Sequence, residues 1–312
     1  MTGRWALALG IALAATSFCA GSARAETSIY VAKQPGLDLV LKADGEDVYA
    51  TYLRATLICR GAGSHWEESN EATDWAFTKG PVELRRRGGG LSLIRLRNGP
   101  FDSSREVVRG RIQPDRIVGS FSFFASGEGI GGTCEADAPG FEPEFGEREP
   151  AVPFEAQRYV PLGTPLASAP DPAEEALYFT SSKLFEIYLG VEGGSLARVH
   201  GTAMLSCLTP MGKTPARRYS LGFDPPYPLD GQELSFDAQA TFDYGFKARF
   251  AQLTGTVDEE AAAGRLRIFS SHRAGSHVTS RCRTGQIGGD GYLAFSAGRY
   301  LPVTASLSEG MG

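Results

Sequence analysis

The sequence is poor in the residues that most often carry enzyme chemistry. Its 312 residues include only 5 cysteines and 4 histidines. It contains no G-x-S-x-G elbow, H-E-x-x-H pair, P-loop or C-x-x-C pair. Those are the short motifs of serine hydrolases, zinc peptidases, phosphate-binding loops and thiol oxidoreductases. We therefore predict no catalytic residue, no metal ligand and no cofactor.

Sustained helical periodicity is also missing. No long segment repeats apolar residues at the period of an amphipathic helix, whereas 39 glycines and 18 prolines punctuate the chain at short intervals. Hydrophobic residues make up 42% and charged residues 21% of the sequence. This ordinary globular composition excludes a collagen, a coiled coil and a wholly disordered chain. The pattern predicts an all-β protein of many short strands.

The first 25 residues have the composition of a secretory signal peptide. Arg4 supplies the positive end, Trp5–Phe18 is apolar, and Ala23-Arg24-Ala25 resembles a cleavage site. The apolar stretch is shorter than the roughly 20 residues of a membrane span, and no later apolar run approaches that length. We predict a mature chain without a transmembrane segment, exported to the periplasm or the extracellular space after cleavage near Ala25. Lipid attachment at Cys19 is the alternative.

The predicted mature chain is acidic. Without Arg4 and Arg24 it has 29 basic and 36 acidic residues, which argues against nucleic acid or an anionic membrane as the main partner. Grooves for single-stranded nucleic acid interleave aromatic side chains with basic ones, and the local basic cluster has no aromatic residue. We interpret this cluster as a solvated strand and loop face. Its members are Arg85, Arg86, Arg87, Arg95 and Arg97.

The four cysteines of the mature chain have a repeated spacing. Each pair is separated by 75 positions, and the two pairs are offset by 148. At the same offset, residues 30–59 align without gaps on residues 178–207 with six identities. This agreement indicates a tandem duplication. The cysteines are Cys59 and Cys134 in the first copy, and Cys207 and Cys282 in the second.

Two further patterns support the duplication. A pair of glycines separated by eight residues occurs in each copy, and each copy ends with an aromatic residue followed by an Arg-Tyr-apolar-Pro run. The glycine pairs are Gly110 with Gly119 and Gly255 with Gly264; the closing runs are Phe154 with Arg158–Pro161 and Phe295 with Arg299–Pro302.

The duplication predicts two tandem antiparallel domains of the β-sandwich or jelly-roll type, each with one intradomain disulfide. Because few contacts would cross the proline-rich linker, we expect the domains to be independent units. The predicted boundaries are 1–25 for the signal peptide, 26–162 for the first repeat, 163–176 for the linker, 177–303 for the second repeat and 304–312 for the C-terminal tail.

An oxidising compartment favours disulfides, and four cysteines allow three pairings. Duplication selects Cys59–Cys134 and Cys207–Cys282, because a bond of the ancestral unit appears twice. Zinc is disfavoured, since zinc-binding cysteines usually come in closely spaced pairs and each cysteine here stands alone. Free thiols are the remaining alternative.

The residues around the second cysteine of each copy resemble those of uncharacterised secreted bacterial proteins with two cysteines per β-rich unit. The resemblance rests on Cys282-Arg283-Thr284-Gly285 with Phe295-Ser296-Ala297, and more loosely on Cys134 with Phe154-Glu155-Ala156. It implies a β-sandwich fold and no particular activity.

Two adjacent residues are our candidates for ligand contact. His65 and Trp66 lie in a predicted loop of small and polar residues, and Trp66 has no aromatic equivalent in the second copy. An indole presented there stacks well on a sugar ring or a partner protein. A tryptophan folded back over the sheet is the alternative.

Two other groups are interpreted as solvated loops. His272 and His277 lie close together before Cys282, with a metal or catalytic pair as the alternative. The acidic insert at residues 135–149 has a calcium site as its alternative.

These observations favour an exported, non-catalytic tandem β-sandwich protein that binds a glycan, a cell-envelope component or a protein. The alternative is a secreted glycoside or ester hydrolase whose carboxylates are not visible as a motif. Fold class does not decide between them. A cleft with two carboxylates favours the hydrolase, and a shallow surface favours the binding protein.

The duplication makes a direct prediction about cysteine pairing. Peptide mapping of the unreduced protein should yield Cys59 joined to Cys134 and Cys207 joined to Cys282. A bond between the copies, such as Cys59–Cys207, would contradict the argument from duplication.

Overall fold

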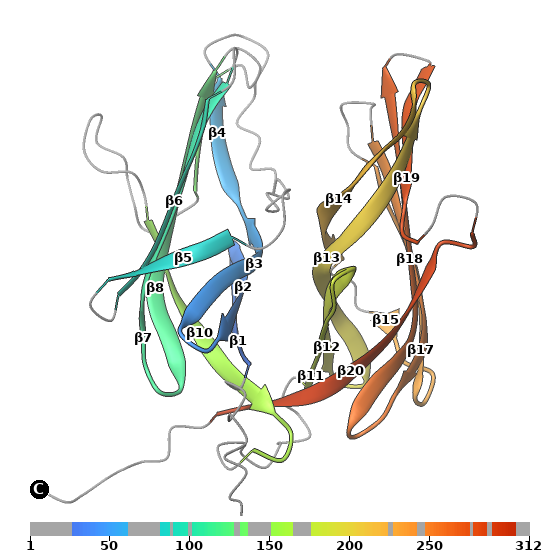
Figure 1. Ribbon diagram of the computed structural model, residues 1–312. Coiled ribbons are helices and arrows are strands. Elements are labelled where there is room, and N and C mark those ends of the chain that lie inside the picture. The colour runs from blue at the N-terminus through green and yellow to red at the C-terminus, as the bar shows by residue number, and fades with distance from the viewer. Residues whose placement is uncertain are drawn as a thin grey trace, which may run out of the picture.

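The protein is all-β, as the sequence predicts, and its twenty described strands form two lobes that meet at one end (Figure 1). The predicted signal peptide, most of the predicted linker and the C-terminal tail lie outside the described residues. The computed structural model describes residues 27–61, 82–87, 90–98, 102–127, 132–136, 151–164, 176–223, 227–241, 247–274, 277–285 and 289–303.

The N-terminal half contains the first ten strands. They are β1 (Ser28–Gln34), β2 (Leu37–Asp44), β3 (Asp47–Ala55), β4 (Leu57–Gly61), β5 (Val82–Arg87), β6 (Gly90–Asn98), β7 (Asp102–Ile112), β8 (Arg116–Gly127), β9 (Gly132–Ala136) and β10 (Ala151–Pro161).

Eight of these strands close into a barrel. Antiparallel pairing runs in the order β1, β2, β3, β5, β6, β7, β8 and β10, and β10 pairs again with β1. Strands β4 and β9 pair with each other, and β9 also pairs with β8. The fold of this half is therefore a closed barrel with two extra strands, where the sequence predicted a β-sandwich or jelly roll. Closure removes the unpaired strand edges that a sandwich leaves.

The C-terminal half contains the other ten strands. They are β11 (Ala176–Ser181), β12 (Phe185–Glu192), β13 (Ser195–Thr209), β14 (Gly212–Phe223), β15 (Tyr227–Pro228), β16 (Glu233–Thr241), β17 (Lys247–Val257), β18 (Ala261–Ala274), β19 (His277–Arg283) and β20 (Tyr292–Pro302).

Strand β13 pairs with several other strands of this half. It is continuous over 15 residues, whereas Thr56 separates β3 from β4 in the N-terminal half. It pairs with β12 over its first part, with β14 from Val199 onward, and with β19 near its end. Strands β18 and β20 connect β19 back to β11, so the pairing again forms a closed ring.

The strand registers of the two halves agree at the sequence offset of 148. The first strand pairs with the second in the same register in both halves, and the start of the second strand pairs with the third in the same register. The matched pairs are Tyr30↔Leu41 with Tyr178↔Leu189, and Leu37↔Ala55 with Phe185↔Ala203. In each half, the last strand also pairs with the first strand in an equivalent register, through Tyr30↔Arg158 and Tyr178↔Arg299.

Glycine pairs mark the places where neighbouring strands come very close. Gly110 faces Gly119 between β7 and β8, and Gly255 faces Gly264 between β17 and β18. A Cβ atom at Gly119 or Gly264 would lie 2.1 or 2.2 Å from a carbonyl oxygen of the neighbouring strand. No side chain fits at such a distance. Strand packing therefore requires the repeated glycine spacing.

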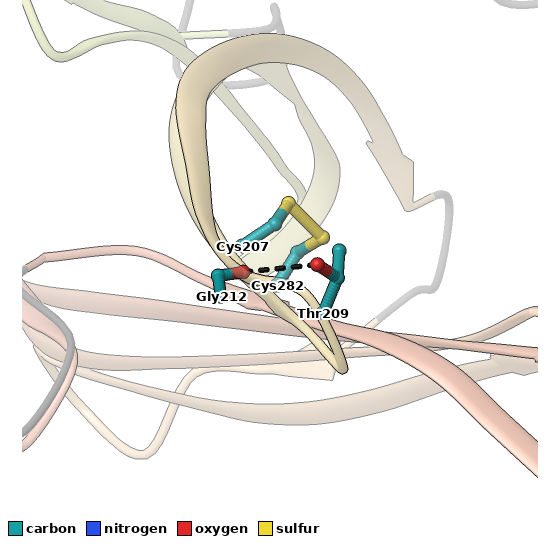
Figure 2. The surroundings of a disulfide bond; sticks show 4 residues. All are labelled: Cys207, Thr209, Gly212 and Cys282. Atoms are coloured by element: carbon teal, nitrogen blue, oxygen red, sulfur yellow. Dashed lines mark hydrogen bonds between the residues drawn. A yellow bond between two sulfur atoms is a disulfide. The ribbon is translucent and has the colours of Figure 1, made fainter.

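The predicted disulfide of the C-terminal half is present. Cys207 on β13 lies opposite Cys282 on β19, with the Cα atoms 4.0 Å apart, beside the turn at Thr209–Gly212 (Figure 2). In the N-terminal half, Cys59 lies opposite Cys134 in the β4–β9 register, and Cys134 is disulfide-bonded. Closing a loop of 75 residues restricts the unfolded chain, which stabilises the folded state by about 4 kcal/mol.

Main-chain pairing joins the two halves. The end of β10 pairs with the end of β20 over three residues, and β20 also pairs with β11. The Val303 N–H donates to the Arg158 carbonyl at 2.8 Å, and the Leu162 N–H donates to the Arg299 carbonyl at 2.8 Å. One strand therefore hydrogen-bonds to both halves.

The contact between the two halves, which we name the joint, contains a buried cluster of nine apolar and aromatic residues. Strands β1, β2 and β12 are therefore buried on both faces, which accounts for their continuous apolar runs. The expectation of independent units with few contacts between them is wrong, whereas the domain boundaries stay predictions. The cluster consists of Ile29, Val31, Val40, Tyr52 and Tyr159 of the N-terminal half with Leu177, Phe179, Tyr188 and Tyr300 of the C-terminal half.

The shared core predicts that the halves stay together without their covalent link. A site-specific protease sequence introduced between Pro165 and Glu175 would allow the chain to be cut there. After cleavage, both fragments should elute as one species in size-exclusion chromatography, because the β10–β20 pairing and the buried cluster hold them. Fragments that separate in native buffer would contradict the shared core.

Candidate functional site

The residues that the sequence singles out for ligand contact, His65 and Trp66, lie outside the described residues. The acidic insert beyond Ala136 does so too. His272 and His277 belong to the paired strands β18 and β19, not to a loop as predicted. Two other regions of the described chain are therefore candidates for a functional site: the polar contacts inside the joint and the outward sheet face of the N-terminal half.

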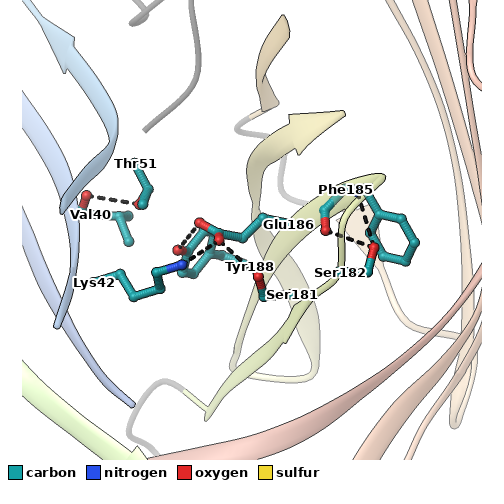
Figure 3. Close-up of polar contacts among 8 residues, drawn as sticks. All are labelled: Val40, Lys42, Thr51, Ser181, Ser182, Phe185, Glu186 and Tyr188. Carbon is teal, nitrogen blue, oxygen red and sulfur yellow. Dashed lines mark hydrogen bonds and ion pairs between the residues drawn. The ribbon is translucent and has the colours of Figure 1, made fainter. Parts of the chain in front are cut away.

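A buried carboxylate anchors the polar contacts of the joint. Glu186 on β12 is 1% exposed, and three groups hold it (Figure 3). Lys42 of the N-terminal half approaches Oε2 with its Nζ at 2.7 Å, and the Ser181 hydroxyl donates to the same oxygen at 3.1 Å. The Tyr188 hydroxyl donates to Oε1 at 2.6 Å. The carboxylate is thus satisfied by a cation from the other half and two hydroxyls from its own.

The environment of Tyr188 fixes its hydroxyl as a donor. Burial raises the pKa of Tyr188 well above its ordinary value, and the neighbouring Glu186 carboxylate raises it further. The phenol therefore stays protonated at every physiological pH. A protonated phenol next to a carboxylate is a charge-assisted hydrogen-bond donor.

A second acid makes the reciprocal contact. Asp38 on β2 aligns with Glu186 at the offset of 148, and it approaches two basic side chains of the C-terminal half. Its carboxylate oxygens lie 4.0 Å from Arg198 Nη1 and 3.7 Å from His200 Nε2. The His200 ring also stacks on Tyr52, with ring centroids 3.6 Å apart. Tyr52 and His200 are themselves equivalent positions, since each pairs with the matching residue of the preceding strand.

The joint therefore uses its ionisable groups for cohesion. Each half contributes one acidic side chain that contacts a basic side chain of the other half. The Tyr52 ring of one half stacks on the His200 ring of the other. Arg198, His200 and Glu186 are all at most 1% exposed. The sequence held a signal for this arrangement, because Asp38 and Glu186 interrupt apolar strands at aligned positions. It could not show that the two strands face each other.

The outward face of β6 and β7 presents a different combination of side chains. Ile94 is 55% exposed and Leu96 is 64% exposed, although both lie on a strand. Register places Ile94 opposite Val107 and Leu96 opposite Arg105, so these four share the outward face, on which Val107 itself is buried. Leu91, Leu93 and Val108 point into the barrel and are buried.

Arginines continue this face toward the start of β6. Arg109 and Arg111 are exposed, and they pair with Ser92 and Gly90 of β6. Arg85 on β5 is exposed and lies opposite Ser92. We name this surface the basic–apolar face; it comprises Arg85, Ile94, Leu96, Arg105, Arg109 and Arg111.

At the positions equivalent to Ile94 and Val107, the C-terminal half has polar side chains. The glycine pairs align the two faces, so Asp237 corresponds to Ile94 and Gln252 corresponds to Val107. Gln252 donates to Asp237 at 3.3 Å and accepts from the Tyr292 hydroxyl at 3.0 Å. An exposed apolar strip therefore exists on the N-terminal copy of this face and is replaced by a hydrogen-bonded network on the other.

The remaining features of the described chain offer little chemistry. A shallow depression of about 500 Å³ lies between the halves, lined by Lys33, Gln34, Pro35 and Glu192. Within the described ranges, no group of three or more His, Cys, Asp or Glu side chains is arranged to hold a metal ion. The same ranges contain no helix of the length and hydrophobicity that crossing a membrane requires.

Comparison with known proteins gives no match, whether to protein-family models, to curated proteins or to solved structures. The candidate site therefore rests on the geometry of this chain.

The buried ion pair gives a testable stability difference. Lys42→Met should lower the free energy of unfolding by about 3 kcal/mol, because it leaves the Glu186 carboxylate buried without its cation. Urea denaturation followed by circular dichroism measures this change. The double variant Lys42→Met with Glu186→Gln should recover more than half of the loss, since the amide oxygen still accepts from Tyr188.

A matched control lies nearby. Lys33 and Glu192 also pair between the halves, at 3.2 Å, but their side chains are 54% and 52% exposed. Lys33→Met should therefore change stability by less than about 1 kcal/mol. Equal effects of the two lysine substitutions would contradict the structural role of Lys42.

Proposed function

We propose that this chain is an exported, non-catalytic binding protein built as a tandem duplication, and that the basic–apolar face of its N-terminal half is the ligand surface. The observation that carries the proposal is the difference between two equivalent faces. Ile94 and Leu96 are exposed on one face, whereas polar residues occupy the same positions on the other.

The energetic argument rests on exposed apolar area. An exposed leucine or isoleucine on a regular strand gains about 1.5–3 kcal/mol when a partner buries it fully. Two such residues side by side, flanked by cations, are typical of an interaction surface. A single scattered apolar residue would not support this argument.

Other observations support the remaining parts of the proposal. The agreement of strand registers at the offset of 148 supports the duplication. The disulfide is compatible with an oxidising compartment and hence with export. The carboxylates of Asp38 and Glu186 are occupied by cations within the joint, which favours the binding protein over the alternative hydrolase.

The test gives the N-terminal half the residues of the C-terminal half. Ile94→Asp with Leu96→Gln should weaken binding of the mature chain to isolated bacterial envelopes or to a glycan panel by at least about tenfold. The melting temperature should stay within a few degrees, because surface substitutions change stability little. Product analysis on the same glycans should detect no cleavage.

Met211→Ser is the control, since Met211 is 99% exposed on the other half, and it should leave binding unchanged. Binding that survives the double substitution would move the ligand surface elsewhere. Soluble products released from a glycan would favour the hydrolase.

A further inference from the structure

We infer that the ligand of the basic–apolar face is an anionic lipid surface. This inference rests on the proposed function and names the chemical class of the envelope component. It follows from the order of side chains along the sheet, from their pairing and from the direction in which the face points.

Arginines occupy one end of the face, and the exposed aliphatic side chains lie toward the other end together with Arg105. Its outward rows contain first Arg111, then Arg85 with Arg109, then Ile94 with Val107, and last Leu96 with Arg105. Half-buried Phe124 of β8 extends the last row. Alternate residues of an antiparallel strand are about 7 Å apart. The arginines and the aliphatic side chains therefore lie side by side on one sheet face, about 7 Å apart from row to row, so a flat lipid surface that meets the face contacts both.

Three of the four arginines of this face, Arg85, Arg109 and Arg111, are available to an external anion. In the described part of the chain, no acidic side chain pairs with Arg85, Arg109 or Arg111. Exposed Glu83 lies two residues from Arg85 on the same side of β5 but makes no ion pair with it, and Glu155 on β10 accepts a hydrogen bond from Arg116 at 3.1 Å. The chain as a whole is acidic, with a net charge of −5. These three arginines attract an anionic surface to this face, whereas the net negative charge of the rest of the chain repels it elsewhere.

The direction of the face suits a flat partner. Strands β6 and β7 lie on the side of their lobe turned away from the other lobe, and β17 and β18 lie on the opposite outer side (Figure 1). A planar surface that meets the basic–apolar face therefore does not meet its polar counterpart. Aliphatic side chains insert among acyl chains, whereas Ile94 and Leu96 offer no flat ring on which a sugar could stack.

The experiment is co-sedimentation of the mature chain with lipid vesicles. The chain should bind vesicles of phosphatidylcholine containing phosphatidylglycerol, and not vesicles of phosphatidylcholine alone. High salt should weaken the binding, because it screens the charges. Arg109→Gln with Arg111→Gln should weaken binding by about thirtyfold, at about 1 kcal/mol for each arginine. Leu96→Ser should weaken it by about tenfold.

The matched control is Arg265→Gln with Arg281→Gln, which removes the same charge from exposed positions of the C-terminal half. This control should bind like the unaltered chain. Equal losses in both arginine variants would show that only net charge matters and would overturn the inference.

A second comparison separates this inference from the proposed function. Dextran sulfate offers anionic charge without acyl chains. Binding to dextran sulfate that depends on Arg109 and Arg111 but not on Leu96, without binding to the phosphatidylglycerol vesicles, would identify an acidic polysaccharide and overturn the lipid. Binding to envelopes that depends on Ile94 and Leu96 would still support the proposed function, whereas no binding to envelopes, glycans or vesicles would contradict both.

Discussion

The structure depends on the buried contact between its two halves. Nine apolar and aromatic side chains exclude water there, and the Lys42–Glu186 pair crosses the contact inside this dry environment. Removing water strengthens the attraction between the charges but makes any unpaired charge costly. Glu186 is stable in this position because a cation and two hydroxyls satisfy it.

The joint explains why some strands of each half tolerate substitution better than others. Strands β1, β2, β12 and β13 contribute to the contact, so both faces of these strands are constrained by packing. Strands β6, β7, β16 and β17 have only their inward faces in a core. Substitutions on their outward faces cost little stability, and it is there that Ile94 and Asp237 occupy equivalent positions with opposite chemistry.

Several elements could be predicted from the sequence because their causes are local or repeated. Alternation of apolar residues and abundant turn residues predicted strands, and the register of Cys207 opposite Cys282 follows the repeated spacing of cysteines. The glycine spacing was visible too, although its reason, the close approach of β7 to β8, was not. The continuous apolar run at Ile29–Ala32 is typical of a strand that is buried on both faces.

The candidate surface was harder to foresee. Net charge is a sum over the whole chain, so it argued against an anionic partner. The register of β5, β6 and β7 instead gathers the arginines of three strands on one face. The side chains of Ile94 and Leu96 have the same alternation as a strand with an ordinary buried face, and only the barrel determines which face is inside.

The sequence by itself determined the all-β class, because strand formation depends on backbone preferences and on neighbours close along the chain, and it indicated the Cys207–Cys282 bond through the repeated cysteine spacing. Only the tertiary structure decided barrel closure, the joint between the halves and the outward direction of Ile94 and Leu96. These features depend on contacts such as Lys42 with Glu186, which are 144 positions apart. No local pattern specifies which of two distant strands will face each other, because that choice is made by the packing of the whole chain.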